Sequence, residues 1–158
     1  MINTNKEKIE ELLTRGVENI YPNKEFLEEK LKKGKRLTLY LGIDPTEDTL
    51  HIGHVITLRK LKEFQDMGHR VILLLGDFTA LYGDPDKTEV RKRLNESDVL
   101  KNSKNYKRQA SKILSFSRFN NGATIKRNST WLRKLRFADV MKLASHFTVE
   151  YMRKRDLF

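Results

Sequence analysis

Residues 37–76 read LTLYLGIDPTEDTLHIGHVITLRKLKEFQDMGHRVILLLG, and this stretch decides the fold. It begins and ends with largely apolar runs, residues 37–43 and 71–76, which have the length and composition of buried strands. Between the runs, apolar residues over 52–67 recur at helical spacing, and Gly68 closes that helix. The order strand, helix, strand predicts a βαβ unit with a right-handed crossover, and hence an α/β fold with a parallel sheet.

Two polar loops, residues 44–54 and 76–86, directly follow the predicted strands. In open parallel sheets, ligands bind in the crevice outside the carboxyl ends of the strands. We therefore expect both loops to contribute to one ligand site.

The rest of the chain supplies the expected flanking elements. Apolar residues at helical spacing predict two helices before residue 37, over residues 9–17 and 26–31. Further along, the pattern predicts a basic helix over 95–114, a short third strand over 123–126 and a helix over 137–151. The expected organisation is a helical segment at 1–36 followed by a partial nucleotide-binding domain at 37–158.

Length and composition exclude several classes of protein. A chain of 158 residues has the size of one ordinary domain. It contains no run of about 20 apolar residues and no apolar secretory leader, so we expect a cytoplasmic protein without a membrane anchor. It has no cysteine and only four histidines, so we expect no bound structural or catalytic metal.

The positive charge is concentrated in one segment. The whole chain carries a net charge of +11, and residues 87–136 hold 15 Lys and Arg against 3 Asp and Glu. Four aromatic residues are interleaved there, namely Tyr106, Phe116, Phe119 and Trp131. The segment fits either a contact surface for nucleic-acid phosphates or a solvated, lysine-rich surface.

The tetrapeptide His51-Ile52-Gly53-His54 lies at the start of the predicted central helix. A helix N-terminus attracts phosphate, and two imidazoles on its first turn add N–H donors for phosphate oxygens. Gly53 would let an adenine ring approach the backbone. The alternative interpretation is a capped helix with two surface histidines.

Three segments in order, residues 39–54, 76–85 and 131–140, resemble tyrosyl-tRNA synthetases of the bacterial type. The first contains Gly42-Ile43-Asp44-Pro45-Thr46 ahead of the His-Ile-Gly-His tetrapeptide, at that family's spacing. The resemblance extends from residue 37 to the end of the chain. It implies a Rossmann-like (HUP-type) parallel sheet with flanking helices, as in the first half of a class I synthetase catalytic domain.

The resemblance also implies roles for individual residues. The expected catalytic residues are His51, His54 and Thr46. The expected ATP-binding residues are Gly42, Asp44, Thr46, His51, Gly53, His54 and Lys87, and the expected tyrosine-binding residues are Tyr40, Thr79 and Asp84. Lys87 is assigned from its basic loop, because this chain has Asp86-Lys87-Thr88 where the family has Ser-Gly. Taken singly, Tyr40 could instead be a core aromatic residue, and Asp84-Pro85 a simple turn.

The reaction implied by the resemblance is tyrosine activation for tRNA charging. The tyrosine carboxylate attacks the α-phosphate of ATP, Mg²⁺ accompanies the ATP, and the tyrosyl group passes from the adenylate to tRNA-Tyr. Full-length members are expected to form homodimers. This sequence contains neither the Lys-Met-Ser-Lys-Ser-type loop nor the Tyr-x-x-x-Gln helix of the family's second half. We therefore expect a chain that ends before that half, with weak ATP binding and negligible aminoacylation alone.

Three other classes of protein share some of these features. Nucleotidylyltransferases also carry an Asp-Pro and a His-x-Gly-His, but there the two elements almost adjoin, whereas here residues 46–50 separate them. A tryptophanyl-tRNA synthetase would show a different sequence at the end of the first strand. A basic RNA-binding module without catalysis, derived from the synthetase fold, is favoured only by the charge of residues 87–136.

Overall fold

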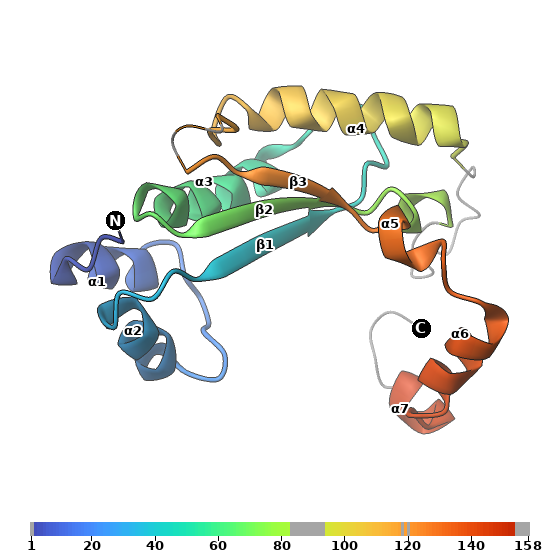
Figure 1. Cartoon of the computed structure of the whole chain (residues 1–158), viewed down its shortest axis with the longest axis horizontal. Coiled ribbons are helices and arrows are strands. Elements are labelled where there is room, and N and C mark those ends of the chain that lie inside the picture. The colour runs from blue at the N-terminus through green and yellow to red at the C-terminus, as the bar shows by residue number, and fades with distance from the viewer. Residues whose placement is uncertain (1, 83–93, 118, 120, 154–158) are drawn as a thin grey trace. The chain divides into compact units, whose positions relative to one another are not determined.

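The computed structural model describes residues 2–82, 94–117, 119 and 121–153 (Figure 1). The order of its elements is α1 (Lys6–Thr14), α2 (Lys24–Lys32), β1 (Thr38–Ile43), α3 (Ile52–Asp66), β2 (Arg70–Leu75), the 3-10 helix η1 (Thr79–Leu81), α4 (Glu96–Ala110), β3 (Thr124–Arg127), α5 (Ser129–Leu132), α6 (Phe137–Ala144) and α7 (Val149–Arg153). The predicted strand, helix and strand over residues 37–76 are therefore confirmed.

The three strands form one parallel sheet in the order β1-β2-β3 (Figure 1). The register at the carboxyl ends is set by two backbone hydrogen bonds. Gly76 N–H donates to Ile43 O at 2.9 Å, and Asn128 N–H donates to Leu75 O at 3.0 Å. The α/β fold with a parallel sheet and flanking helices is thus confirmed, and the residues that follow each strand meet at one edge of the sheet.

Contacts between Cα atoms divide the chain into two compact units. The first comprises residues 1–41, 50–73 and 107–126, and the second comprises residues 42–49, 74–106 and 127–158. The boundary falls within each strand, so the first unit holds the beginnings of the strands and the second holds their ends.

In the first unit, α1 packs against α2 and α3. Asparagine caps begin two of these helices: the Asn5 side chain accepts from Lys8 N–H at 3.0 Å, and the Asn23 side chain accepts from Phe26 N–H at 2.8 Å. The apolar faces of the three helices supply much of this unit's core, which contains Ile9, Leu12, Leu13, Leu31, Leu58, Leu61, Phe64, Met67, Val71, Leu73, Ala110, Leu114 and Ala123.

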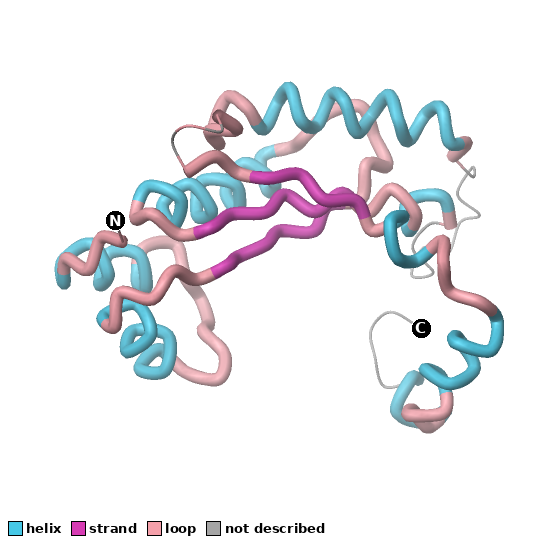
Figure 2. Tube along the Cα trace, viewed as in Figure 1, coloured by secondary structure: helices cyan, strands magenta, loops and turns pink. Residues whose placement is uncertain are grey.

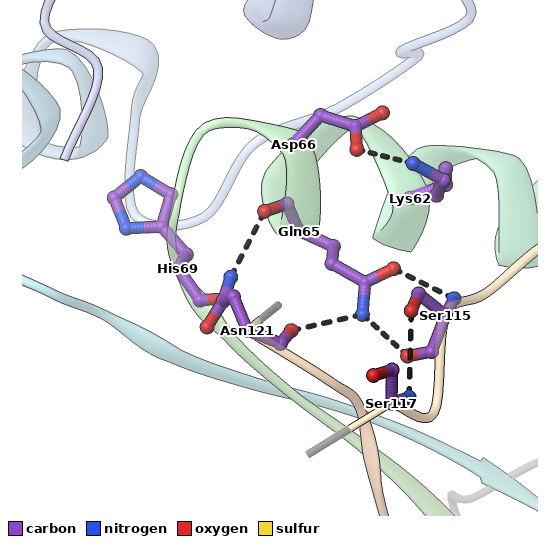
Figure 3. A network of polar contacts seen from close by, with 7 residues as sticks. All are labelled: Lys62, Gln65, Asp66, His69, Ser115, Ser117 and Asn121. Atoms are coloured by element: carbon purple, nitrogen blue, oxygen red, sulfur yellow. Dashed lines mark hydrogen bonds and ion pairs between the residues drawn. The ribbon is translucent and has the colours of Figure 1, made fainter. Parts of the chain in front are cut away.

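A polar cluster joins the end of α3 to the segment before β3 (Figure 3). The amide of Gln65, only 4% exposed, donates from Nε2 to Ser115 O at 2.7 Å and to Asn121 O at 3.0 Å, and its Oε1 accepts from Ser115 N–H at 3.0 Å. In return, Asn121 Nδ2 donates to Gln65 O and His69 O, both at 2.9 Å. Carbonyls at a helix end lack partners within the helix, so Asn121 completes the last turn of α3 from a distant segment.

In the second unit, the predicted helix over 137–151 is wrong as a single element. The chain forms α6 and α7 with a turn between them (Figure 2). The cause is local: Thr148 Oγ1 accepts from Tyr151 N–H at 3.1 Å, which caps a new helix start. No residue from 131 to 151 is buried, and the buried apolar residues described in this unit include Ile43, Leu75, Ala80, Val99 and Tyr106.

The longest helices of the described ranges, α3 and α4, have 15 residues each. Across those same ranges, none of the helices combines the length and the apolar character that crossing a bilayer requires.

Candidate active site

Two histidines build the N-terminus of α3 in the first unit. His51 Nδ1 accepts from Gly53 N–H at 3.2 Å, and His54 Nδ1 accepts from His51 N–H at 3.3 Å. The ring centroids lie 3.9 Å apart. The pair thus forms a reciprocal capping box in which imidazoles replace the usual Ser or Thr and Glu.

These caps fix which nitrogen carries the proton. A neutral imidazole has one acceptor and one donor nitrogen, and here Nδ1 is the acceptor in both rings. In a neutral ring with this contact, the proton lies on Nε2, and this holds for His51 and His54 alike. Capping the helix and donating to a phosphate are compatible, because they use different nitrogens of the same ring.

The two glycines of the predicted ATP site differ in what surrounds them. A Cβ added to Gly42 would meet no atom of the described residues within 4 Å, so none of those neighbours requires a glycine there. A Cβ on Gly53 would lie 3.0 Å from Cε1 and 3.1 Å from Nδ1 of His51, close enough to press on the capping ring.

In the second unit, side chains following all three strands form one hydrogen-bonded group. Thr79 Oγ1 donates to Asp44 Oδ1 at 2.9 Å, and Asn128 Nδ2 donates to Thr79 Oγ1 at 3.0 Å. Gly76 lies beneath the carboxylate, since a Cβ there would be 1.7 Å from Asp44 Oδ1. The structure therefore brings together Asp44 and Thr79, two of the predicted residues, with Asn128 and Gly76, which were not predicted.

The loop after β1 also forms a hydrogen bond with α4. Asn102 of α4, 7% exposed, donates from Nδ2 to Pro45 O at 3.1 Å, and Thr46 N–H closes a tight turn onto Asp44 O at 2.8 Å. Pro45 is fully buried and Thr46 is half-buried. The backbone of this loop is thus fixed by packing and by hydrogen bonds from elements far along the chain.

The remaining predicted residues are placed as follows. Tyr40 on β1 belongs to the first unit and is 71% exposed, so its interpretation as a core aromatic residue is wrong. His51, Gly53 and His54 also belong to the first unit, and Gly42, Asp44, Thr46 and Thr79 belong to the second. Asp84 and Lys87 lie outside the described residues. The roles in binding and catalysis stay predictions.

One feature of the sequence points to Asn128. It directly follows the third strand, at the edge of the sheet where polar residues were expected after the first two. No such signal marked Asn102, a polar residue in the middle of a basic helix.

The second unit also contains a cavity of about 230 Å³, lined by residues of η1, α4 and the end of β3 together with Asp77 and Arg133. Its charged lining residues form two ion pairs, Arg127 Nη1 to Asp77 Oδ2 at 3.7 Å and Arg133 Nη2 to Glu96 Oε1 at 2.8 Å. The lining contains none of the predicted site residues, and its paired charges leave no clear preference for an anion or a cation.

Comparison with known proteins agrees with the geometry. The model of the family "tRNA synthetases class I (W and Y)" matches residues 32–158. The tyrosine-tRNA ligase of Carboxydothermus hydrogenoformans is 49% identical over 94% of this chain, and that of Thermotoga maritima is 45% identical over 93%. The chain spans 36% of the length of each.

Solved structures show the same fold. A C-terminally truncated mitochondrial tyrosyl-tRNA synthetase from Aspergillus nidulans has a TM-score of 0.78 at 23% identity, over 97% of this chain and 46% of that one. The tyrosyl-tRNA synthetase from Archaeoglobus fulgidus, complexed with L-tyrosine, has a TM-score of 0.69 at 23% identity, over 91% and 41%. With the family model matching most of the sequence, the chain belongs to the class I tRNA synthetases of the W and Y family.

Proposed function

We propose that this chain carries part of the site at which ATP and tyrosine react to form tyrosyl-adenylate, the activated precursor of tyrosyl-tRNA. A tyrosine carboxylate oxygen attacks the α-phosphorus of ATP, and the bond from that phosphorus to pyrophosphate breaks. No side chain acts as a nucleophile, so the contribution of the protein is positioning and electrostatic stabilisation. Mg²⁺ would enter with ATP.

The observation that carries the proposal is the pair of capping histidines. Their Nδ1 atoms are occupied by the cap, so their Nε2–H groups serve as phosphate donors beside the partial positive charge of the α3 N-terminus. Donors fixed before ATP arrives need no reorganisation when negative charge shifts in the transition state. His51 and His54 are thus proposed as the catalytic residues of this chain.

The loop from Asp44 to Thr46 and the two glycines support the nucleotide part of the site. Thr79 and Asn102 hydrogen-bond to this loop without any ligand, and a loop ordered in advance lowers the entropic cost of binding. Gly42 has open space above it, as a surface that receives a flat ligand requires.

Tyrosine is proposed as the amino acid because the curated relatives matched here are named tyrosine-tRNA ligases. The exposed phenol of Tyr40 offers a hydrogen-bonding group for the hydroxyl of the substrate. A site that hydrogen-bonds this hydroxyl rejects phenylalanine strongly, since its own polar groups are left unpaired. The proposal assigns Asp84 to the same hydroxyl and Lys87 to the phosphates, and Thr79 to the neighbourhood of the ammonium group.

Transfer RNA is the proposed macromolecular partner. Lys101 and Lys104 on α4 are exposed and form no ion pair in the described ranges, whereas Lys24, Lys60 and Lys62 each pair with a carboxylate. Lysines without a carboxylate neighbour are available to displace counterions from a phosphate backbone. This observation also suits RNA binding without catalysis, which the exchange experiment below distinguishes.

Homodimer formation stays a prediction. The exposed apolar side chains of α6, including Phe137 and Met141, are compatible with a contact surface for another polypeptide. Sedimentation equilibrium over a range of concentrations measures it.

The decisive experiment is tyrosine-dependent exchange of pyrophosphate into ATP. It is run with this chain alone and with the complementary part of the Carboxydothermus hydrogenoformans relative supplied as a second polypeptide. Exchange that requires both this chain and tyrosine supports the proposal. If neither mixture shows exchange while the chain still binds tRNA in a salt-dependent manner, the RNA-binding alternative holds instead.

A further inference from the structure

We propose that Asn128 is a positioning residue, which acts through the Thr79 hydroxyl to hold the Asp44 carboxylate in one orientation at the carboxyl end of β1. All three residues belong to the second unit. The inference rests on the proposed function only for its consequence in catalysis.

The orientation of the Asn128 amide is fixed by a backbone donor. Its Oδ1 accepts from Phe78 N–H at 2.9 Å, so Nδ2 is the atom that faces Thr79, 3.0 Å from Oγ1. An amide nitrogen only donates, and Thr79 Oγ1 therefore accepts this hydrogen bond.

The single hydrogen of the Thr79 hydroxyl then goes to Asp44. Two oxygens lie within reach, Asp44 Oδ1 at 2.9 Å and Gly76 O at 3.1 Å. The carboxylate is nearer and carries charge, which makes it the stronger acceptor. Asn128, Thr79 and Asp44 thus form a chain in which each donor points toward the carboxylate, and neighbouring bonds in such a chain strengthen one another.

The neighbouring backbone holds both ends of this series of hydrogen bonds in place. Asn128 is 8% exposed, and its own N–H pairs with Leu75 O, so the side chain is held at its base. Gly76 leaves the space that the Asp44 carboxylate occupies, because any Cβ there would lie 1.7 Å from Oδ1. The position of the Asp44 carboxylate is therefore restricted by its contact with Gly76 and by the hydrogen bond from Thr79.

Asp44 begins the loop that the proposed function assigns to ATP. A residue that fixes Asp44 fixes the start of this loop without touching a ligand itself. Asn128→Ala is accordingly expected to fold. In the exchange reaction it is expected to raise KM for ATP and to lower kcat.

The test needs no substrate. The 158-residue chain is labelled with ¹³C at the aspartate carboxyls, and the titration of Asp44 is followed by NMR in the wild type, Thr79→Val, Asn128→Ala and the double variant. A hydrogen bond to the charged form favours it, so each single variant is expected to shift the Asp44 titration to higher pH. The double variant is expected to shift it no further than Thr79→Val alone, because Asn128 acts only through the hydroxyl.

Three results would overturn the inference: an unshifted Asp44 in Asn128→Ala, additive shifts in the double variant, or an equal shift of Asp77, the control carboxylate bound by Ser129. If Asn128→Ala fails to fold, a comparison of Thr79→Val with Thr79→Ser tests the inference instead. Only the serine should restore both the wild-type titration of Asp44 and the wild-type signals of the Asn128 side-chain amide. Failure of pyrophosphate exchange would leave this titration unaffected, so the two proposals fail separately.

Discussion

Replacing Gln65 by Met is predicted to destabilise the protein by about 2 kcal/mol. Met has a similar length and shape but no hydrogen-bonding amide. The substitution removes the side-chain partner of two half-buried backbone groups, Ser115 N–H and Asn121 O, whereas Ser115 O keeps its hydrogen bond from Ala123 N–H at 2.7 Å. Each unsatisfied group costs on the order of 1 kcal/mol or more, and the loss is felt in full because Gln65 is 4% exposed.

The assay is urea unfolding followed by circular dichroism, with the slope of the free energy against urea checked for constancy. Lys62→Met is the matched control, since Lys62 lies on the same helix and pairs with Asp66 at the surface (Figure 3). An exposed pair of this kind contributes less than about 1 kcal/mol. The reasoning would be refuted if Gln65→Met cost no more than Lys62→Met.

Three further predictions concern the site and its pH dependence. Gly42→Ala should leave the free energy of unfolding within about 0.5 kcal/mol of the wild type, because its Cβ meets open space, and yet raise KM for ATP in the reconstituted exchange assay. His54→Ala should lower kcat of exchange by about 100-fold, as loss of one preorganised donor does; a change in KM alone would argue against a catalytic role. Burial and, secondly, the charge of Arg36 lower the pKa of His69 below its ordinary value of 6.5. The contribution of neutral His69 to the free energy of unfolding should therefore be full above pH 6.5. It should decline as the pH falls from there toward the lowered pKa, because the unfolded chain binds the proton first. The urea midpoint should fall over the same pH range in the wild type, and this fall should be smaller in His69→Gln.

The sequence predicted the βαβ unit because its signals are local. Apolar runs define β1 and β2, helical spacing defines α3, and Gly68 marks the end of that helix. The same local reasoning failed between α6 and α7. There a side-chain cap at Thr148 outweighed a continuous helical pattern, and the exposed segment offered no buried face to favour one long helix.

The candidate site was predictable only in part, for a related reason. His51 and His54 are three residues apart, so their mutual capping follows from helix geometry. The bonds of Asn102 and Asn128 join residues separated by about 50 positions in sequence, and neither helical nor strand periodicity reports such contacts. Sequence likewise does not predict the tautomer of the two histidines, because it depends on which nitrogen faces the backbone.

The exposed helices α6 and α7 have a consequence for any solution study of this chain. They are 8 and 5 residues long, and none of the side chains that the structure describes in them, up to residue 151, is buried. Isolated helices of fewer than about 12 residues are marginal in water, so both depend on local bonds such as the Thr148 cap. Deuterium should therefore enter their amides well before it enters β2, and far-ultraviolet ellipticity should fall short of the helix content drawn in Figure 2. A second polypeptide that slows deuterium uptake in α6 and α7 and also increases the helical ellipticity would identify these two helices as the part of the chain that gains order on association.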